Sequence, residues 1–214
     1  MSGCCGHDAK FDGVSDSYKR RLWLVIAINA VMFGVEMAAG ALAGSRALQA
    51  DALDFAGDAA TYGLSLAVIG APLATRSMAA LIKGFSLLLM GLWVMGYTIY
   101  GVFVIGVPNA PVMGIVGFLA LAANLASVLI LMAYKDGDAN VRSVWLCSRN
   151  DAIGNVAVMF AAIGVWGTAT GWPDLAVAGL MASLFLSSAW QIIRQALAER
   201  REAAQSATVH RNAT

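Results

Sequence analysis

Six long apolar stretches, separated by short polar or turn-forming segments, make up most of the chain. The stretches cover residues 21–43, 47–69, 78–104, 112–134, 141–166 and 173–197. Each is long enough to cross a bilayer, because about 20 helical residues span the roughly 30 Å of hydrocarbon. None shows the period-2 alternation of a membrane β-barrel. The pattern therefore predicts an all-α membrane protein with six transmembrane helices.

The composition agrees with this class of protein. Hydrophobic residues make up 59% of the 214 residues, charged residues make up 13%, and the mean hydropathy is +0.71. Soluble domains contain about 45–50% apolar and about 25% charged residues. The net charge is only +1 and no segment forms a dense basic patch, so a nucleic-acid partner is not expected.

The basic residues predict how the helices are oriented, because cytoplasmic loops carry an excess of lysine and arginine. Except for Arg46 and Arg149, every basic residue falls on or near one side of the six segments. That side also holds both termini, which we therefore expect to be cytoplasmic. The compact loops favour an integral protein of a bacterial inner (plasma) membrane.

Three regions follow from this topology. Residues 1–20 are polar and lack the apolar core of a signal peptide, so they are expected to form a flexible cytoplasmic tail. Residues 21–198 are expected to form the transmembrane domain. Residues 199–214 are expected to form a short polar cytoplasmic tail, because so few residues cannot bury a core of their own.

Polar residues inside the apolar segments mark the candidate site, because a charge at the centre of a membrane helix costs about 2.5–3.5 kcal/mol on insertion scales. The second segment contains Asp51, Asp54 and Asp58, and the fifth contains Cys147 and Asp151. Asp54 and Asp58 are four residues apart and share one helix face, as do Cys147 and Asp151. If the two helices pack together, three carboxylates and one thiol converge. Such a set suits a borderline or soft divalent ion.

This set of ligands also predicts a coupling to protons. Three ionised carboxylates repel one another, and either a divalent ion or protons would relieve the repulsion. Competition between a metal and protons for the same groups is the minimal requirement for an antiporter.

Structural explanations stay open for each of these residues. A single intramembrane aspartate can be a hydrogen-bond partner, and Asp51 is near enough to the outer interface to be solvated or to cap the helix start. Cys147 can be a small apolar filler. Arg149 points about 200° away from Cys147 around the helix, and it could pair with Glu36.

Other polar and small residues predict contacts between helices. Asn29 and Asn124 are expected to form interhelical hydrogen bonds, and Gly40 and Gly44 form a GxxxG pattern that permits close packing.

The N-terminal tail contains Cys4, Cys5 and His7. The three cysteines of the chain cannot all pair with one another, so a thiol or metal-ligand role is favoured over a disulfide framework. The tail cluster could collect metal and pass it to the transmembrane site, or its residues could be incidental.

The second and fifth segments resemble two signatures of the cation diffusion facilitator family of divalent metal/proton antiporters. The first signature covers residues 44–58, preceded by Asn29, Glu36 and Gly40, and the second covers residues 140–156. In the family, a His or Asp and an Asp four residues later bind the ion in the second helix, and a His-x-x-x-Asp motif binds it in the fifth. The resemblance runs from about residue 29 to residue 197.

The resemblance implies specific roles for residues of this chain. Asp54, Asp58, Cys147 and Asp151 match the four transport-site ligands. Asp51 and Asn155 match neighbouring positions whose role is less certain. The family further implies a six-helix protomer, homodimers in the lipid membrane and proton-coupled export of a divalent metal from the cytoplasm, with no cofactor and no enzymatic activity.

The chain departs from the family pattern in two ways. Cys147 replaces the usual histidine, and this softer ligand should favour Cd, Pb or Zn over Mn, Fe(II) or Mg. It also changes the titrating group from an imidazole to a thiol. In addition, we expect a short form without the usual C-terminal cytoplasmic domain, in which membrane helices would have to hold the dimer.

Two other functions compete with transport. One is a membrane metal sensor or binding protein that uses the tail thiols and transports nothing. The other is an intramembrane aspartyl hydrolase. The sequence has no Gly-x-Gly-Asp motif, and Asp54 and Asp58 lie on one helix instead of facing each other across two.

Overall fold

The computed structural model describes residues 15–68, 73–104, 106–135 and 139–212, with the backbone alone at some helical positions. The described residues form α1 (Asp16–Ala43), α2 (Arg46–Ala67), α3 (Leu73–Phe103), α4 (Ala110–Leu131), the short 3-10 helix η1 (Met132–Tyr134), α5 (Ala139–Thr168) and α6 (Trp172–Asn212). No strand occurs within these ranges. The predicted all-α class and the six long helices are confirmed.

The helices form an integral membrane domain. Five helical stretches are long and apolar enough to cross a membrane, and they lie in α1, α3, α4, α5 and α6. Large apolar side chains face outward, and Trp93, Phe103 and Trp166 are 68%, 83% and 79% exposed. Hydrocarbon is a suitable solvent for such a surface, whereas water is not. The remaining helix, α2, is less apolar because it carries the aspartates of the candidate site.

Local residues explain where several helices begin and end. Ser15 caps α1 by accepting a hydrogen bond from the Tyr18 amide at 3.2 Å. Gly44 ends α1 in a left-handed conformation with φ 68°, which glycine adopts without steric cost. Ser45 then caps α2 through the Leu48 amide at 3.1 Å.

The last helix is longer than the sequence analysis predicts. We expected residues 199–214 to form a short polar tail after the last membrane helix, but α6 continues to Asn212. The residues just beyond Leu197 are mostly alanine, glutamate and arginine, which are strong helix formers even without a core to pack against.

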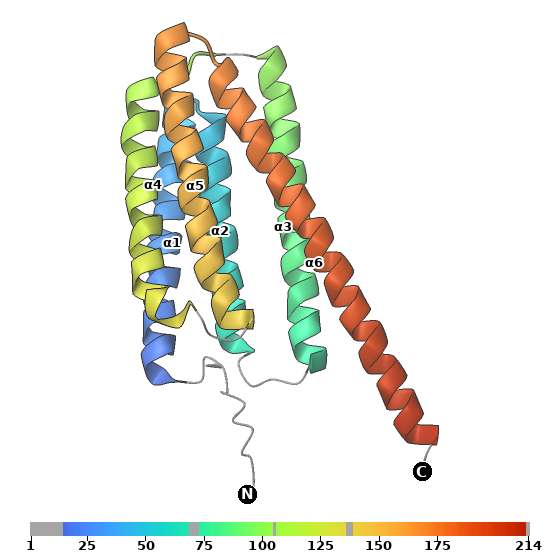
Figure 1. Cartoon of the computed structure of the whole chain (residues 1–214). Helices are drawn as coiled ribbons and strands as arrows, with labels where there is room; N and C mark the ends of the chain where they lie inside the picture. Colours follow the sequence, from blue (N-terminus) through green and yellow to red (C-terminus); the bar gives the residue numbers. More distant parts are fainter. Residues whose placement is uncertain (1–14, 69–72, 105, 136–138, 213–214) are drawn as a thin grey trace, which may run out of the picture.

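The helices divide into a four-helix group and a separate pair (Figure 1). Helices α1, α2, α4 and α5 pack together, and α3 pairs with α6 beside them. The start of α1 and the end of α6 lie at the same end of the bundle, which we call the terminal end. The α1–α2 and α5–α6 turns lie at the opposite, distal end.

Glycines allow the closest helix contacts. A Cβ at Gly91 of α3 would lie 3.0 Å from Leu186 of α6, and a Cβ at Gly84 would lie 2.7 Å from Ile193. A Cβ at Gly40 of α1 would lie 3.0 Å from a side-chain carbon of α2. The close contact predicted for Gly40 is therefore present, whereas the second glycine of that pattern forms the turn after α1 instead.

A buried aspartate joins α6 to α2 at the distal end. Asp174, which is 1% exposed, accepts a hydrogen bond from the Ser45 hydroxyl at 2.6 Å. It also accepts bonds from the Arg46 amide at 2.7 Å and the Ala47 amide at 3.1 Å. A carboxylate at a helix N-terminus is favoured by the free amides and by the helix dipole. The Arg46 guanidinium lies 3.5 Å from the ring centroid of Tyr97 on α3, so all three helices meet here.

Candidate functional site

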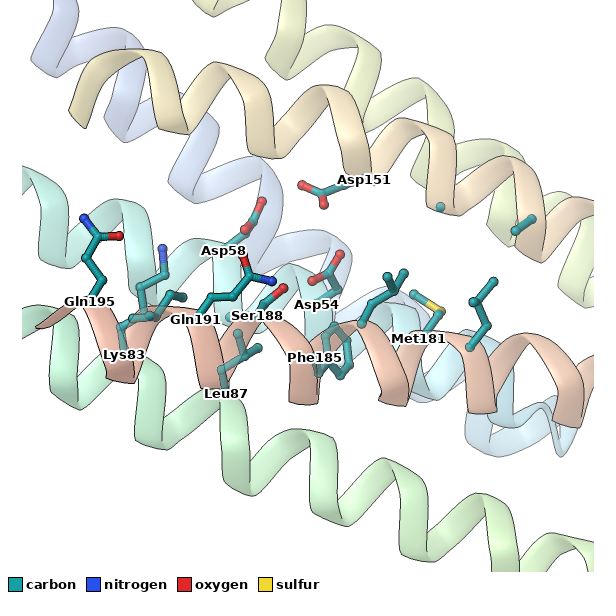
Figure 2. A pocket seen from close by; sticks show the side chains of 16 residues that line it. Asp54, Asp58, Lys83, Leu87, Asp151, Met181, Phe185, Ser188, Gln191 and Gln195 are labelled. Atoms are coloured by element: carbon teal, nitrogen blue, oxygen red, sulfur yellow. The ribbon is translucent and has the colours of Figure 1, made fainter. Parts of the chain in front are cut away.

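A cavity of about 470 Å³ separates α2 and α5 from the α3–α6 pair. Asp54 and Asp58 of α2 and Asp151 of α5 line one side of it, and their carboxyl groups point toward one another (Figure 2). The side chains of Asp54 and Asp151 are close enough to interact, although they come from different helices. The i, i+4 spacing on α2 and the packing of α2 against α5 thus bring the three carboxylates to one cavity.

The three carboxylates do not form a closed metal cage. Among the described residues, no three histidine, cysteine, aspartate or glutamate side chains lie close enough together to hold one ion. The cavity leaves room for an ion with part of its hydration shell, and for movement of the side chains. The role of these residues as metal ligands stays a prediction.

The predicted cysteine ligands are only partly located. Cys147 occupies a position on α5 four residues before Asp151, but its side chain, like that of Arg149, lies outside the described part of the structure. Cys4, Cys5 and His7 also lie outside the described residues. The proposed ion pair between Arg149 and Glu36 is therefore not tested.

Asp58 is held in place by a hydrogen-bond chain between α2 and α5. The Tyr62 hydroxyl donates to the Asp58 carboxylate, and it also lies 3.3 Å from the Ser148 hydroxyl of α5. Asp58 and Tyr62 are four residues apart, so the same helix spacing positions the carboxylate and its donor. This contact fixes the orientation of Asp58 while one of its edges still faces the cavity.

A second polar chain lies behind the cavity wall. The Asn124 side chain of α4 donates to the Asn155 side-chain amide oxygen at 2.8 Å, and the Asn155 side chain of α5 donates to the Asp51 carboxylate of α2 at 2.6 Å. Asp51 is 2% exposed, so the proposal that it is solvated near an interface is wrong. Neither Asp51 nor Asn155 lines the cavity with the other three carboxylates. The chain therefore ties three helices together, and the predicted interhelical role of Asn124 is confirmed.

Two buried polar residues of α1 extend this region. The Glu36 carboxyl group is fully buried beside Asp51, and neither of its oxygens makes a hydrogen bond of ordinary geometry within the described residues. Asn29 donates to the Val25 carbonyl of its own helix at 2.8 Å. The observed hydrogen bond of Asn29 therefore lies within its own helix and does not join two helices as predicted.

The sequence analysis missed the polar side chains on the opposite wall of the cavity. This wall carries Lys83 from α3 and Ser188, Gln191 and Gln195 from α6. In the sequence analysis, Lys83 serves only as one of the basic residues that indicate the cytoplasmic side, although Lys83 lies within the apolar stretch that begins at Met78. Its charge inside a membrane segment was a usable signal, whereas isolated serine and glutamine residues give none.

Comparison with known proteins supplies the final observations. Residues 74–199 match the family of the cation efflux transmembrane domain. The chain is 29% identical to the zinc transporter ZitB of Yersinia pestis, over 88% of this chain and 65% of that protein. It is 28% identical to the zinc transporter ZitB of Yersinia pseudotuberculosis serotype I (strain IP32953), with the same coverage. The chain thus spans 65% of the length of these two relatives.

Proposed function

Because this chain belongs to the cation diffusion facilitator (cation efflux) family, we propose that it is a secondary transporter that exports a divalent transition or heavy metal ion. The substrate belongs to the Zn, Cd or Pb class and leaves the cytoplasm in exchange for protons. The ion binds inside the membrane domain, between Asp54 and Asp58 on α2 and Cys147 and Asp151 on α5. The family is one of cation transporters and not of enzymes, so the hydrolase alternative is set aside.

The observation that carries this proposal is the group of three carboxylates at one cavity inside a membrane domain. Several carboxylates gathered inside a membrane domain repel one another and are unfavourable there when all are ionised. A divalent ion relieves this repulsion, and oxygen ligands together with one sulfur ligand suit Zn and its heavier neighbours. Both relatives are named as zinc transporters, which supports the same ion class.

The shape of the domain supports loading from the terminal end. The Asp174 contacts join α6 to α2 at the distal end. The cavity instead extends from Asp54 toward Lys83 and Gln195, which lie nearer the terminal end of their helices. With the orientation expected from the basic residues, the terminal end is cytoplasmic. An ion would then enter from the cytoplasm and leave after the distal contacts open.

Exchange for protons follows from the chemistry of the ligands. Once the ion has left, the carboxylates again repel one another, and protons can take its place. Protons arriving from the outside would return the empty carrier to its loading state without a net build-up of charge at the site. The assembly that fits the family resemblance is a homodimer in a bacterial inner membrane.

Inside-out membrane vesicles provide the test. We expect vesicles that contain the protein to accumulate Zn, Cd or Pb faster than vesicles without it, and an imposed gradient with an acidic interior should accelerate this uptake. Uptake that equals that of empty vesicles for all three ions would contradict transport. Uptake that ignores the pH gradient would contradict only the exchange for protons.

The same vesicles separate transport from the sensor alternative. A sensor that depends on the tail thiols would lose its metal response in a Cys4→Ser/Cys5→Ser double variant. The transporter proposed here should keep most of its uptake in that variant, because the tail would only deliver ions to the cavity.

A further inference from the structure

A positive charge faces the three carboxylates across the cavity. Among the described residues that line it, Lys83 is the basic one, and it comes from α3, whereas Asp54, Asp58 and Asp151 come from α2 and α5. Figure 2 shows the Lys83 ammonium group on the same side of α3 as the cavity, toward Asp58. A lysine near a membrane surface often extends along the helix to reach water. Here the half-buried side chain borders the cavity instead.

Lys83 acts on the carboxylates through the cavity that it shares with them. The lysine and the three carboxylates border the same space from opposite walls. Water or a hydrated ion can therefore occupy the space between them. Charges that share a partly enclosed cavity influence one another over several ångströms, because the effective dielectric constant is lower than that of bulk water.

Among the described lining residues, acidic side chains outnumber basic ones. Asp54, Asp58 and Asp151 carry carboxyl groups, and the ammonium group of Lys83 has the opposite charge. A positive charge at this place opposes part of the negative charge of the cavity and repels a trivalent ion more strongly than a divalent one.

We propose that Lys83 is a specificity-determining residue whose positive charge faces the transport site and limits how tightly metal ions bind there. This inference rests on the proposed transport function and assigns Lys83 a part in it. A carrier must bind its ion strongly enough to load but weakly enough to release it. Without Lys83, the cavity would lose one positive charge, so it would hold a divalent ion more tightly and would favour a trivalent ion still more.

Equilibrium binding to the purified, full-length protein in lipid nanodiscs tests this assignment. In Lys83→Gln, the Kd for Cd²⁺ should fall by roughly tenfold, because one repulsive charge has been removed from the cavity. The luminescence of bound Tb³⁺, a trivalent probe, should rise relative to wild type at equal concentration. In transport, KM should fall together with kcat, since tighter binding slows release. Lys83→Arg should keep wild-type values for all three measurements.

Arg194→Gln is the matched control. Arg194 lies on α6, is exposed, places its guanidinium 5.9 Å from the Trp190 ring centroid, and is not among the described residues that line the cavity. The substitution removes the same charge from the domain, so it should leave the Cd²⁺ Kd and the Tb³⁺ signal unchanged. Lys83→Met, which keeps the apolar stem of the side chain, should repeat the Lys83→Gln result if the glutamine variant is unstable.

Two results would overturn the assignment. One is a Cd²⁺ Kd and a Tb³⁺ signal in Lys83→Gln and Lys83→Met that match those of wild type and Arg194→Gln. The other is a Lys83→Arg variant whose Cd²⁺ Kd and Tb³⁺ signal equal those of Lys83→Gln and Lys83→Met. That result would show that the shape of the lysine side chain matters and its charge does not. In both cases wild-type transport of divalent ions would remain intact. A wild-type protein that neither binds nor transports any divalent ion would overturn the proposed function, and this inference with it.

Discussion

At the scale of single residues, helical spacing predicts which side chains share a face but not what they meet. The spacing of Asp54 and Asp58 identified two carboxylates that line the same cavity. Asp51, only three positions earlier, points to a different environment because Asn155 on α5 donates to it. That partner is 104 residues away in the chain, so no local pattern could reveal it. The hydrogen bonds from Asn124 to Asn155 and from Asn155 to Asp51 stabilise this contact, because a buried carboxylate without a hydrogen-bond donor is destabilising.

In the proposed function, Cys147 is the ligand that should most affect which metal is transported. Replacing it with histidine in a Cys4→Ser/Cys5→Ser background exchanges a thiol for an imidazole while removing the tail thiols. Because imidazole is the harder ligand, the ratio of Cd to Zn uptake should fall by roughly tenfold, which corresponds to about 1.4 kcal/mol of relative binding free energy. Initial rates in inside-out vesicles measure this ratio. An unchanged ratio would show that Cys147 does not contact the transported ion.

At the scale of helices, the sequence was most informative about existence and length, because the bilayer fixes the number of apolar residues that a span needs. It was less informative about ends, as the extra length of α6 shows. The pairing of α3 with α6 could not be predicted. Small residues such as Gly84 and Gly91 occur throughout membrane helices, and only the structure shows which of them face a neighbour.

The α3–α6 pair gives a test at this scale. Valine at Gly91 would place its Cβ 3.0 Å from Leu186, and overpacking of this kind costs about 1–3 kcal/mol. Gly91→Val should therefore lower the melting temperature by roughly 2–10 °C. Gly96→Val is the matched control, because that position of the same helix has no atom within 4 Å of the added Cβ. Equal melting temperatures for the two variants would contradict the tight pairing of α3 and α6.

At the scale of the whole molecule, the two walls of the cavity come from parts of the chain with very different sequence signals. The wall that carries Asp54, Asp58 and Asp151 could be predicted from the sequence. Aspartates are easily recognised in apolar helices, because a charged side chain there costs free energy on membrane insertion. The opposite wall contains Lys83, Gln191 and Gln195, and its position depends on how the α3–α6 pair docks against the other four helices (Figure 1). That docking is set by contacts between distant residues, such as those of Asp174 with the start of α2.

The central claim is that an ion crosses the membrane domain through the carboxylates of α2 and α5. The most direct measurement is the initial rate of Zn uptake into inside-out vesicles by Asp58→Asn and Asp151→Asn, compared at equal protein level with wild type. Asparagine keeps the size of the side chain and can still accept the Tyr62 hydrogen bond, so mainly the charge is lost.

Asp16→Asn provides the matched control, because Asp16 is exposed at the start of α1 and far along the chain from the cavity residues. The account predicts that each cavity variant loses at least roughly tenfold in rate while Asp16→Asn transports like wild type. Wild-type rates in both Asp58→Asn and Asp151→Asn would contradict it.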